Sequence, residues 1–168
     1  MMSATLLGTP EMTGLVGGVP NMLWLEPLIT QRLTAELPAG TWMGDVASLS
    51  DASGRRLQAP GCLVLFSGAV PDSQDLYGRD VEFKQRWTPV AVARAPTEIK
   101  AAADARAEAG ALLASIMNAM LGWKPAGVDS PFKLYAFPAP VYVGSYLLTP
   151  LTFEVSVTFV YNPFEEQD

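Results

Sequence analysis

Apolar residues recur at helical spacing in two segments, and we expect a helix in each. In Glu26–Pro38, one proline suits the opening turn and another ends the segment, and the apolar face consists of Leu28, Ile29, Leu33 and Leu37. The segment Thr97–Leu121 is longer and rich in alanine, and its apolar stripe consists of Ala105, Ala109, Leu112, Ile116 and Met120, widened by Leu113 and Met117. These small residues would let the second helix lie close to a sheet.

Short apolar runs and alternation with a period of two predict strands between the helices. Residues 40–49 are one candidate, and residues 61–70 form a continuous apolar run typical of a buried central strand. In residues 79–87 apolar side chains alternate with charged ones, and Gln85 is the only polar residue on the apolar side. Residues 88–96 would continue this strand after a bulge at Pro89, because proline cannot donate to a ladder.

The last third of the chain is predicted to form strands at residues 131–138, 141–144 and 151–162. In the last of these, apolar residues occupy every second position: Leu151, Phe153, Val155, Val157, Phe159 and Tyr161. The order of elements predicts an α+β fold, with a mostly antiparallel sheet and two main helices packed on one face. We divide the chain into an N-terminal arm (1–20), a single α+β domain (21–161) and an acidic C-terminal tail (162–168).

The arm holds four glycines and two prolines in its twenty residues and a single charge, Glu11. This composition predicts no secondary structure of its own. Packing on its own domain and packing on a neighbour are both open, and we hypothesise that the arm lies on a neighbouring subunit or tail protein.

Composition narrows the class of protein. With 168 residues, 49% of them apolar, the chain can bury a sizeable core. The net charge is −6 and the basic residues are scattered, which argues against binding of a phosphate backbone. No apolar run approaches the roughly 18 residues that span a bilayer, so the sequence predicts a soluble protein without a membrane partner.

The residues of common catalytic sites are scarce. The chain has no histidine and one cysteine, which excludes a Ser-His-Asp triad, His-ligated metal sites and four-cysteine sites. Cys62 lies within an apolar run and is predicted to be buried. Glu82 and Glu154 could face each other across the sheet and act as acid and base, but we favour solvated strand faces for both. We therefore expect no enzyme, no cofactor and no metal.

The end of the long helix predicts a rigid corner. Gly122 suits the left-handed position just past a helix, and Pro125 prevents any continuation. Trp123 falls where an apolar side chain can fold back on Met117, one turn earlier. The chain would leave this corner aimed at the next strand.

The segments of this chain are, in order, the apolar strand 61–68, a polar loop, the strand "VEFKQRWTPVAVAR", the alanine-rich helix ending "LGWKP" and a last aromatic strand. This order of segments resembles that of the tail terminator family of long-tailed bacteriophages. The resemblance covers roughly Leu28–Tyr161. It implies a structural virion protein, assembled in the host cytoplasm, that forms a ring, a homohexamer, at the head-proximal end of the tail tube. Such a ring stops tube growth and joins the tail to the head, with the tail tube protein and neck or connector proteins as partners.

Under this resemblance, DNA would pass through the lumen of the ring without specific binding, and the low affinity of an acidic protein for phosphate agrees with this. The acidic stretch Val70–Asp80 is predicted to be a connection longer than the two to five residues usual in a hairpin. Asp72, Asp75, Arg79 and Asp80 in this stretch could face the lumen or a partner, or the stretch could be filler. Two other functions stay open: another neck or baseplate component of similar fold, and a small-ligand-binding or carboxylate-dependent enzyme domain.

Overall fold

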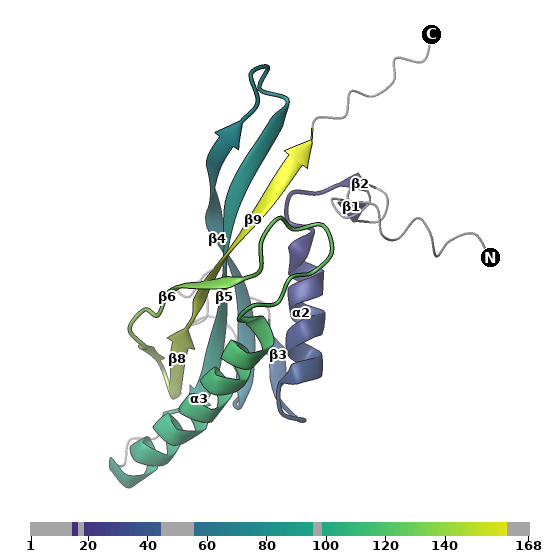
Figure 1. The fold of residues 1–168 in the computed structure, drawn as a ribbon. Coiled ribbons are helices and arrows are strands. Elements are labelled where there is room, and N and C mark those ends of the chain that lie inside the picture. The colour runs from purple at the N-terminus through teal and green to yellow at the C-terminus, as the bar shows by residue number, and fades with distance from the viewer. Residues whose placement is uncertain (1–14, 17–18, 45–55, 96–98, 161–168) are drawn as a thin grey trace, which may run out of the picture.

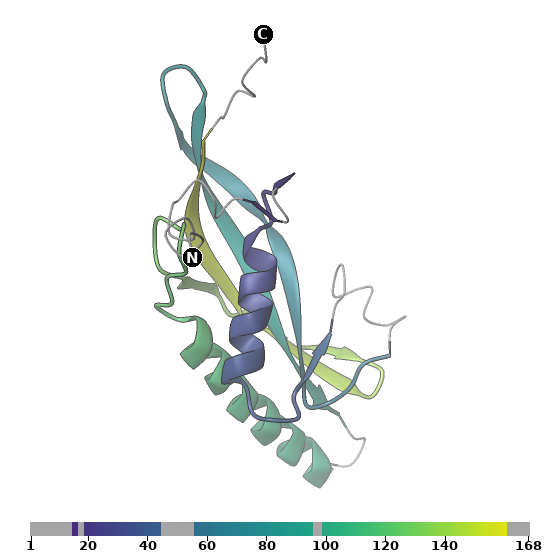
Figure 2. The ribbon, with the colours of Figure 1, turned by 90° about the vertical axis from the view of Figure 1, so that its right-hand side faces the viewer.

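A computed structural model describes residues 15–16, 19–44, 56–95 and 99–160. Two helices, α2 (Leu25–Glu36) and α3 (Ile99–Met120), lie on the same face of a strongly twisted sheet (Figures 1 and 2). Within the described residues, the sheet has seven strands: β3 (Trp42–Gly44), β4 (Gly61–Gln74), β5 (Asp80–Arg94), β6 (Lys133–Ala136), β7 (Val141–Val143), β8 (Tyr146–Pro150) and β9 (Thr152–Val160). This is the predicted α+β architecture. Neither helix is long and apolar enough, in the described ranges, to cross a membrane.

The sheet is organised around β5, which is the longest strand. β4 pairs with nearly all of it on one side. On the other side β8 pairs with Val90–Arg94 and β9 pairs with Asp80–Trp87. β6 extends the sheet beyond β9, β7 extends it beyond β8, and all these pairs are antiparallel. Among the described strands, only β3 runs parallel to its neighbour, β4, so the sheet is mixed.

The main core lies between the helices and the sheet. The stripe predicted for α3 is buried along its whole length, with Ala105, Ala109, Leu112, Ile116 and Met120 between 0% and 6% exposed. From α2, Ile29 and Leu33 are fully buried as predicted, and Leu25 joins them. The sheet contributes alternate residues from three strands: Cys62, Val64, Trp87, Ala91, Phe153, Val155 and Val157.

A smaller core covers part of the opposite face of the sheet. It consists of Leu57, Leu63, Leu65, Val90, Val92 and Leu148. The indole of Trp42 on β3 packs against this cluster and lies across Gly61 on β4, where a Cβ would come within 2.9 Å of the ring. Because both faces of β5 are covered at this end, every residue from Trp87 to Ala93 is buried.

Pro89 does not cause the predicted bulge in β5. It keeps register with Val64 of β4, and the strand continues unbroken to Arg94. The irregularity lies in the partner instead, because Leu151 separates β8 from β9 and donates its N–H to the Pro89 carbonyl at 2.9 Å. In an antiparallel pair the N and C=O of one residue point to the same side, so the missing proline N–H faces this break.

Three further expectations need correction. The connection predicted at Val70–Asp80 is only Asp75–Arg79, because β4 continues to Gln74. β8 was not among the predicted strands. In the N-terminal arm, Leu15–Val16 and Val19–Pro20 pair as the short strands β1 and β2, where no secondary structure was expected. The rest of the arm, residues 45–49 of the first candidate strand and the C-terminal tail lie outside the described residues.

Gln85, the polar residue predicted on the apolar face, is 1% exposed, and both the nitrogen and the oxygen of its amide have a hydrogen-bond partner. Its amide nitrogen donates to the Met22 carbonyl at 2.9 Å, and its amide oxygen accepts from the Trp87 indole at 3.1 Å. A buried amide without partners would be costly. Here it links the chain entering α2 to the middle of β5.

Candidate assembly interface

The most exposed part of the fold is the distal half of the β4–β5 hairpin. We call Ala69–Lys84 the projecting hairpin, and Figure 1 shows it extending past both helices with the end of β9 beside it. No residue of this segment is buried. The two strands twist strongly here, because β4 shifts register at Phe66/Ala69 and again at Pro71/Ser73.

Asp75 organises the turn at the tip. Its carboxylate accepts the N–H of Arg79 at 2.5 Å and the N–H of Asp80 at 3.2 Å. Its backbone N–H donates to the Asp80 carbonyl, and its carbonyl accepts from Gly78, whose φ is +66°. A side chain that bonds the backbone a few residues on replaces missing ladder bonds. The tip is therefore an ordered five-residue turn rather than a loose loop.

The predicted loop residues are brought together, but their charges are partly engaged. Asp72 pairs with Lys84 of the opposite strand at 3.5 Å. The Asp75 carboxylate is used within the turn, and the Arg79 guanidinium lies 5.6 Å from the centre of the Tyr77 ring. Asp80 starts β5 and contributes its backbone to the turn. The acidic surface expected from three aspartates is thus smaller than the sequence suggested.

Two residues that sequence reasoning did not single out dominate the tip. Leu76 is 99% exposed and Tyr77 is 82% exposed. At the end of β9, Phe159 and Val160 are 41% and 59% exposed. Large apolar side chains presented by an ordered turn are typical of a contact surface. The signal in the sequence was the pair Leu-Tyr in a stretch otherwise made of polar residues and glycine.

The same region has open strand edges. β3 pairs only with Gly61–Leu63 of β4, so the outer edge of Val64–Gln74 has no partner strand among the described residues. The pairing of β6 with β9 ends at Glu154 of β9. Beyond it, the loop residues Asp129 and Ser130 form hydrogen bonds with the backbone of Ser156. Unpaired N–H and C=O groups on an edge favour pairing with another chain.

The predicted corner at the end of α3 exists. Gly122 has φ +76°, and its N–H donates to the Phe132 carbonyl at 2.9 Å, while the Phe132 N–H donates to the Trp123 carbonyl at 2.8 Å. Pro125 is buried. The Trp123 ring stacks on Phe132 with centroids 5.5 Å apart, and Met117, the expected partner, packs on the edge of the same core.

Arg32 of α2 was missed and ties the corner to the other helix. Its Nε donates to the Ala119 carbonyl at 3.0 Å, which satisfies one of the free carbonyls in the last turn of α3. Its guanidinium also lies 5.4 Å from the centre of the Trp123 ring. No local pattern marks this contact, since Arg32 lies in α2 and Trp123 follows the end of α3, far along the chain. The corner therefore supports the core.

The pair of carboxylates considered as acid and base is not formed. Glu154 stands opposite Arg86 and makes an ion pair with it at 3.2 Å, and Arg86 also lies 3.9 Å from the centre of the Tyr135 ring. Glu82 stands opposite Thr158 instead. Cys62 is fully buried as predicted, and desolvation raises the pKa of its thiol to about 12. Within the described ranges, no three His, Cys, Asp or Glu side chains gather as metal ligands would.

Comparison with known proteins adds to this geometry. No curated protein matches the sequence. The model of one protein family, described as phage tail terminator protein, matches residues 22–163, which include both helices, all seven strands of the main sheet and the projecting hairpin. The chain belongs to the phage tail terminator family and is a structural component of a phage tail.

Proposed function

We propose that this chain is the tail terminator itself: six copies form a ring at the head-proximal end of the tail tube, stop its elongation and join the tail to the head. The observation that carries this proposal is the family match over residues 22–163. The protein would act by binding the tail tube protein on one side and a neck or connector protein on the other. It would act without catalysis, as a component of the virion assembled in the host cytoplasm.

The surfaces of the chain support self-association. Its exposed apolar tip and its open strand edges lie at one end of the molecule, and these patches differ from one another. Contacts between unlike patches are head-to-tail, and they produce a closed ring when the rotation between copies closes. The net charge of −6 also suits a ring through which DNA passes, because the surface does not attract phosphate.

Two experiments test the proposal. Mass photometry of the purified chain should find a discrete species of six copies whose population rises with protein concentration. A phage with a stop codon in the gene for this chain should yield filled heads separated from tails, and the tails should vary in length beyond the normal value. Tails of normal length joined to heads would contradict the proposal. Tails lacking only a structure at the far end would favour the baseplate alternative.

A further inference from the structure

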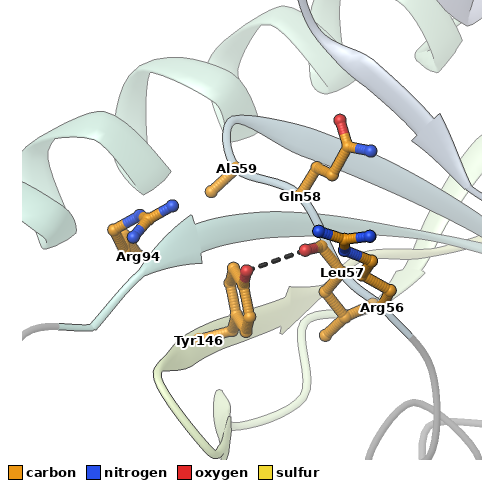
Figure 3. Close-up of a pocket in the computed structure, with 6 residues that line it drawn as sticks. All are labelled: Arg56, Leu57, Gln58, Ala59, Arg94 and Tyr146. Atoms are coloured by element: carbon orange, nitrogen blue, oxygen red, sulfur yellow. Dashed lines mark hydrogen bonds between the residues drawn. The ribbon is translucent and has the colours of Figure 1, made fainter.

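A pocket of about 390 Å³ lies at the end of the sheet opposite the projecting hairpin (Figure 3). It is lined by Arg56, Leu57, Gln58, Ala59, Arg94 and Tyr146. The Tyr146 hydroxyl donates to the Leu57 carbonyl at 2.7 Å, which holds the segment before β4 against β8. Arg94 is opposite Tyr146 at the end of β5. Two distant parts of the chain thus form the pocket together.

The side chains around this pocket are mostly hydrogen-bond donors. Figure 3 shows the guanidinium groups of Arg56 and Arg94 on either side of the tyrosine, with the Gln58 amide beside them. Among the described residues, no carboxylate lines the pocket. Two guanidinium groups and an amide match the oxygens of carboxylates, since arginine binds these with two parallel N–H bonds.

These two arginines differ from others in the chain. Arg32 and Arg86 each pair with a glutamate, and Lys84 pairs with an aspartate. Arg56 and Arg94 are exposed and make no ion pair with any described residue. In a protein with net charge −6, two arginines that line one pocket and pair with no described residue suit an acidic ligand.

The chain itself contains a segment of suitable charge. Residues 161–168 follow β9 and carry Glu165, Glu166 and Asp168 without any lysine or arginine. They continue from Val160, which is opposite Asp80 at the far end of β5. The pocket is at the other end of β5, beside Arg94. In Figure 1 the tip of β9 and the strand β8 lie at opposite ends of the sheet.

The length of β5 decides whether this segment can reach the pocket of its own subunit. At roughly 3.3 Å per residue, the strand from Asp80 to Arg94 spans about 45 Å. Eight fully extended residues reach at most about 27 Å. The acidic segment therefore falls short of its own pocket, but it can reach the pocket of a neighbour placed head-to-tail.

We propose that the acidic segment of each copy binds the Arg56–Arg94 pocket of the next copy, with the carboxylates of Glu165 and Glu166 on the two guanidinium groups. This inference rests on the proposed ring, and it specifies one of the contacts that would close it. Each copy would donate one segment and receive one, as a head-to-tail contact requires. The contact is exposed and ionic, so added salt should weaken it.

Charge reversal with rescue tests the contact. Arg56→Glu with Arg94→Glu, and separately Glu165→Arg with Glu166→Arg, should each raise the concentration at which rings dissociate about tenfold, through loss of attraction and new repulsion. The chain carrying all four changes should recover most of that loss. As a control, Arg106→Glu with Lys124→Glu makes the same change in net charge as the double arginine variant, at exposed positions that do not line the pocket, and rings should persist.

Several results would overturn the inference. If neither double variant changed the concentration at which rings dissociate, the proposed contact would be wrong, although the proposed ring would stand. If the control weakened the rings as much as the double variants do, or if the fourfold variant recovered no stability of the rings, the effect would come from net charge and not from this contact.

A parent chain that remains monomeric would contradict the proposed function. In that case a second measurement, which needs no ring, tests the contact between the acidic segment and the pocket. A labelled peptide of residues 161–168 should bind the full chain saturably, and Arg56→Glu with Arg94→Glu should abolish this binding. No peptide binding overturns the inference. Binding of a labelled DNA duplex through these arginines, in place of the peptide, would assign the pocket to nucleic acid instead.

Discussion

The two halves of β5 have opposite environments, although one continuous strand forms both. From Trp87 to Ala93 every residue is buried, because the helices cover one face and the Leu57 cluster covers the other. From Asp80 to Lys84 no residue is buried, and the strand is flanked only by β4 and β9. The first half is held by its own fold, whereas the second half is available to other chains.

The difference shows in residue type as well as in burial. The outer half keeps apolar residues on one face, with Val81 opposite Phe159 and Phe83 opposite Val157 of β9. Val157 is buried, but Val81, Phe83 and Phe159 keep part of their surface exposed. An apolar stripe that continues beyond the helices covering it is typical of a surface that binds another chain. Substitutions at four places in the molecule would test this division between a folding half and an associating half.

The largest effect is expected in the buried half. Trp87→Ala should lower the free energy of unfolding by about 3–5 kcal/mol, because it leaves a large cavity and removes the partner of the Gln85 amide oxygen. Urea denaturation measures this loss. A stability within about 1 kcal/mol of the parent would mean that this half of β5 is not the centre of the core.

Substitutions at the corner after α3 are expected to lower the free energy of unfolding by a smaller amount. Trp123→Ala should cost about 2 kcal/mol, since the ring is only half-buried and loses its stack on Phe132. Gly122→Val should cost about 1–2 kcal/mol, because a branched side chain is strained at φ +76°. Thermal melting of both variants measures these losses, and Gly122→Asn is the matched control because asparagine tolerates this conformation. A silent Trp123→Ala would show that the corner does not support the core.

At the tip of the projecting hairpin the expected loss is smaller again. Asp75→Ala removes an acceptor of two backbone bonds and should cost about 1 kcal/mol, whereas Asp75→Asn keeps an acceptor and should cost less. Hydrogen exchange of the Arg79 and Asp80 amides should accelerate only in the alanine variant. Unchanged exchange in both variants would indicate that the turn does not depend on this carboxylate.

The smallest stability effect is expected for the exposed pair at the tip. Leu76→Ser with Tyr77→Ser should change the free energy of unfolding by less than about 0.5 kcal/mol, because both side chains are exposed. Tail completion should nevertheless fall in a complementation assay if the tip contacts a partner. Asp72→Asn with Asp80→Asn, beside the tip, is the matched control for a purely electrostatic role. Full complementation by the serine variant would show that the tip does not contribute to the interface.

Part of the candidate interface could be predicted from the sequence. Asp75, Arg79 and Asp80 were expected in an exposed connection; all three are exposed, and Asp75 and Arg79 lie in the turn, whereas Asp80 is the first residue of β5. The length of the connection was overestimated because proline and aspartate, at Pro71 and Asp72, are unfavourable in strands. The strand nevertheless continues there because β4 pairs with β5, with bulges in its register. The prominence of Leu76 and Tyr77 required the turn geometry, since apolar residues in a sequence are ordinarily assigned to the core.

The sequence by itself determined the elements whose burial repeats with a local period. The stripe of α3, the alternation in β9, the place of Gln85 and the glycine that ends α3 are all features of neighbouring residues, and local spacing encodes them. Tertiary structure decided what depends on residues distant along the chain. The break at Leu151 that accommodates Pro89, the stacking of Trp123 on Phe132 and the meeting of Arg56 with Arg94 all require the completed sheet. Long-range pairing brings these residues together, and no periodic pattern in the sequence records it.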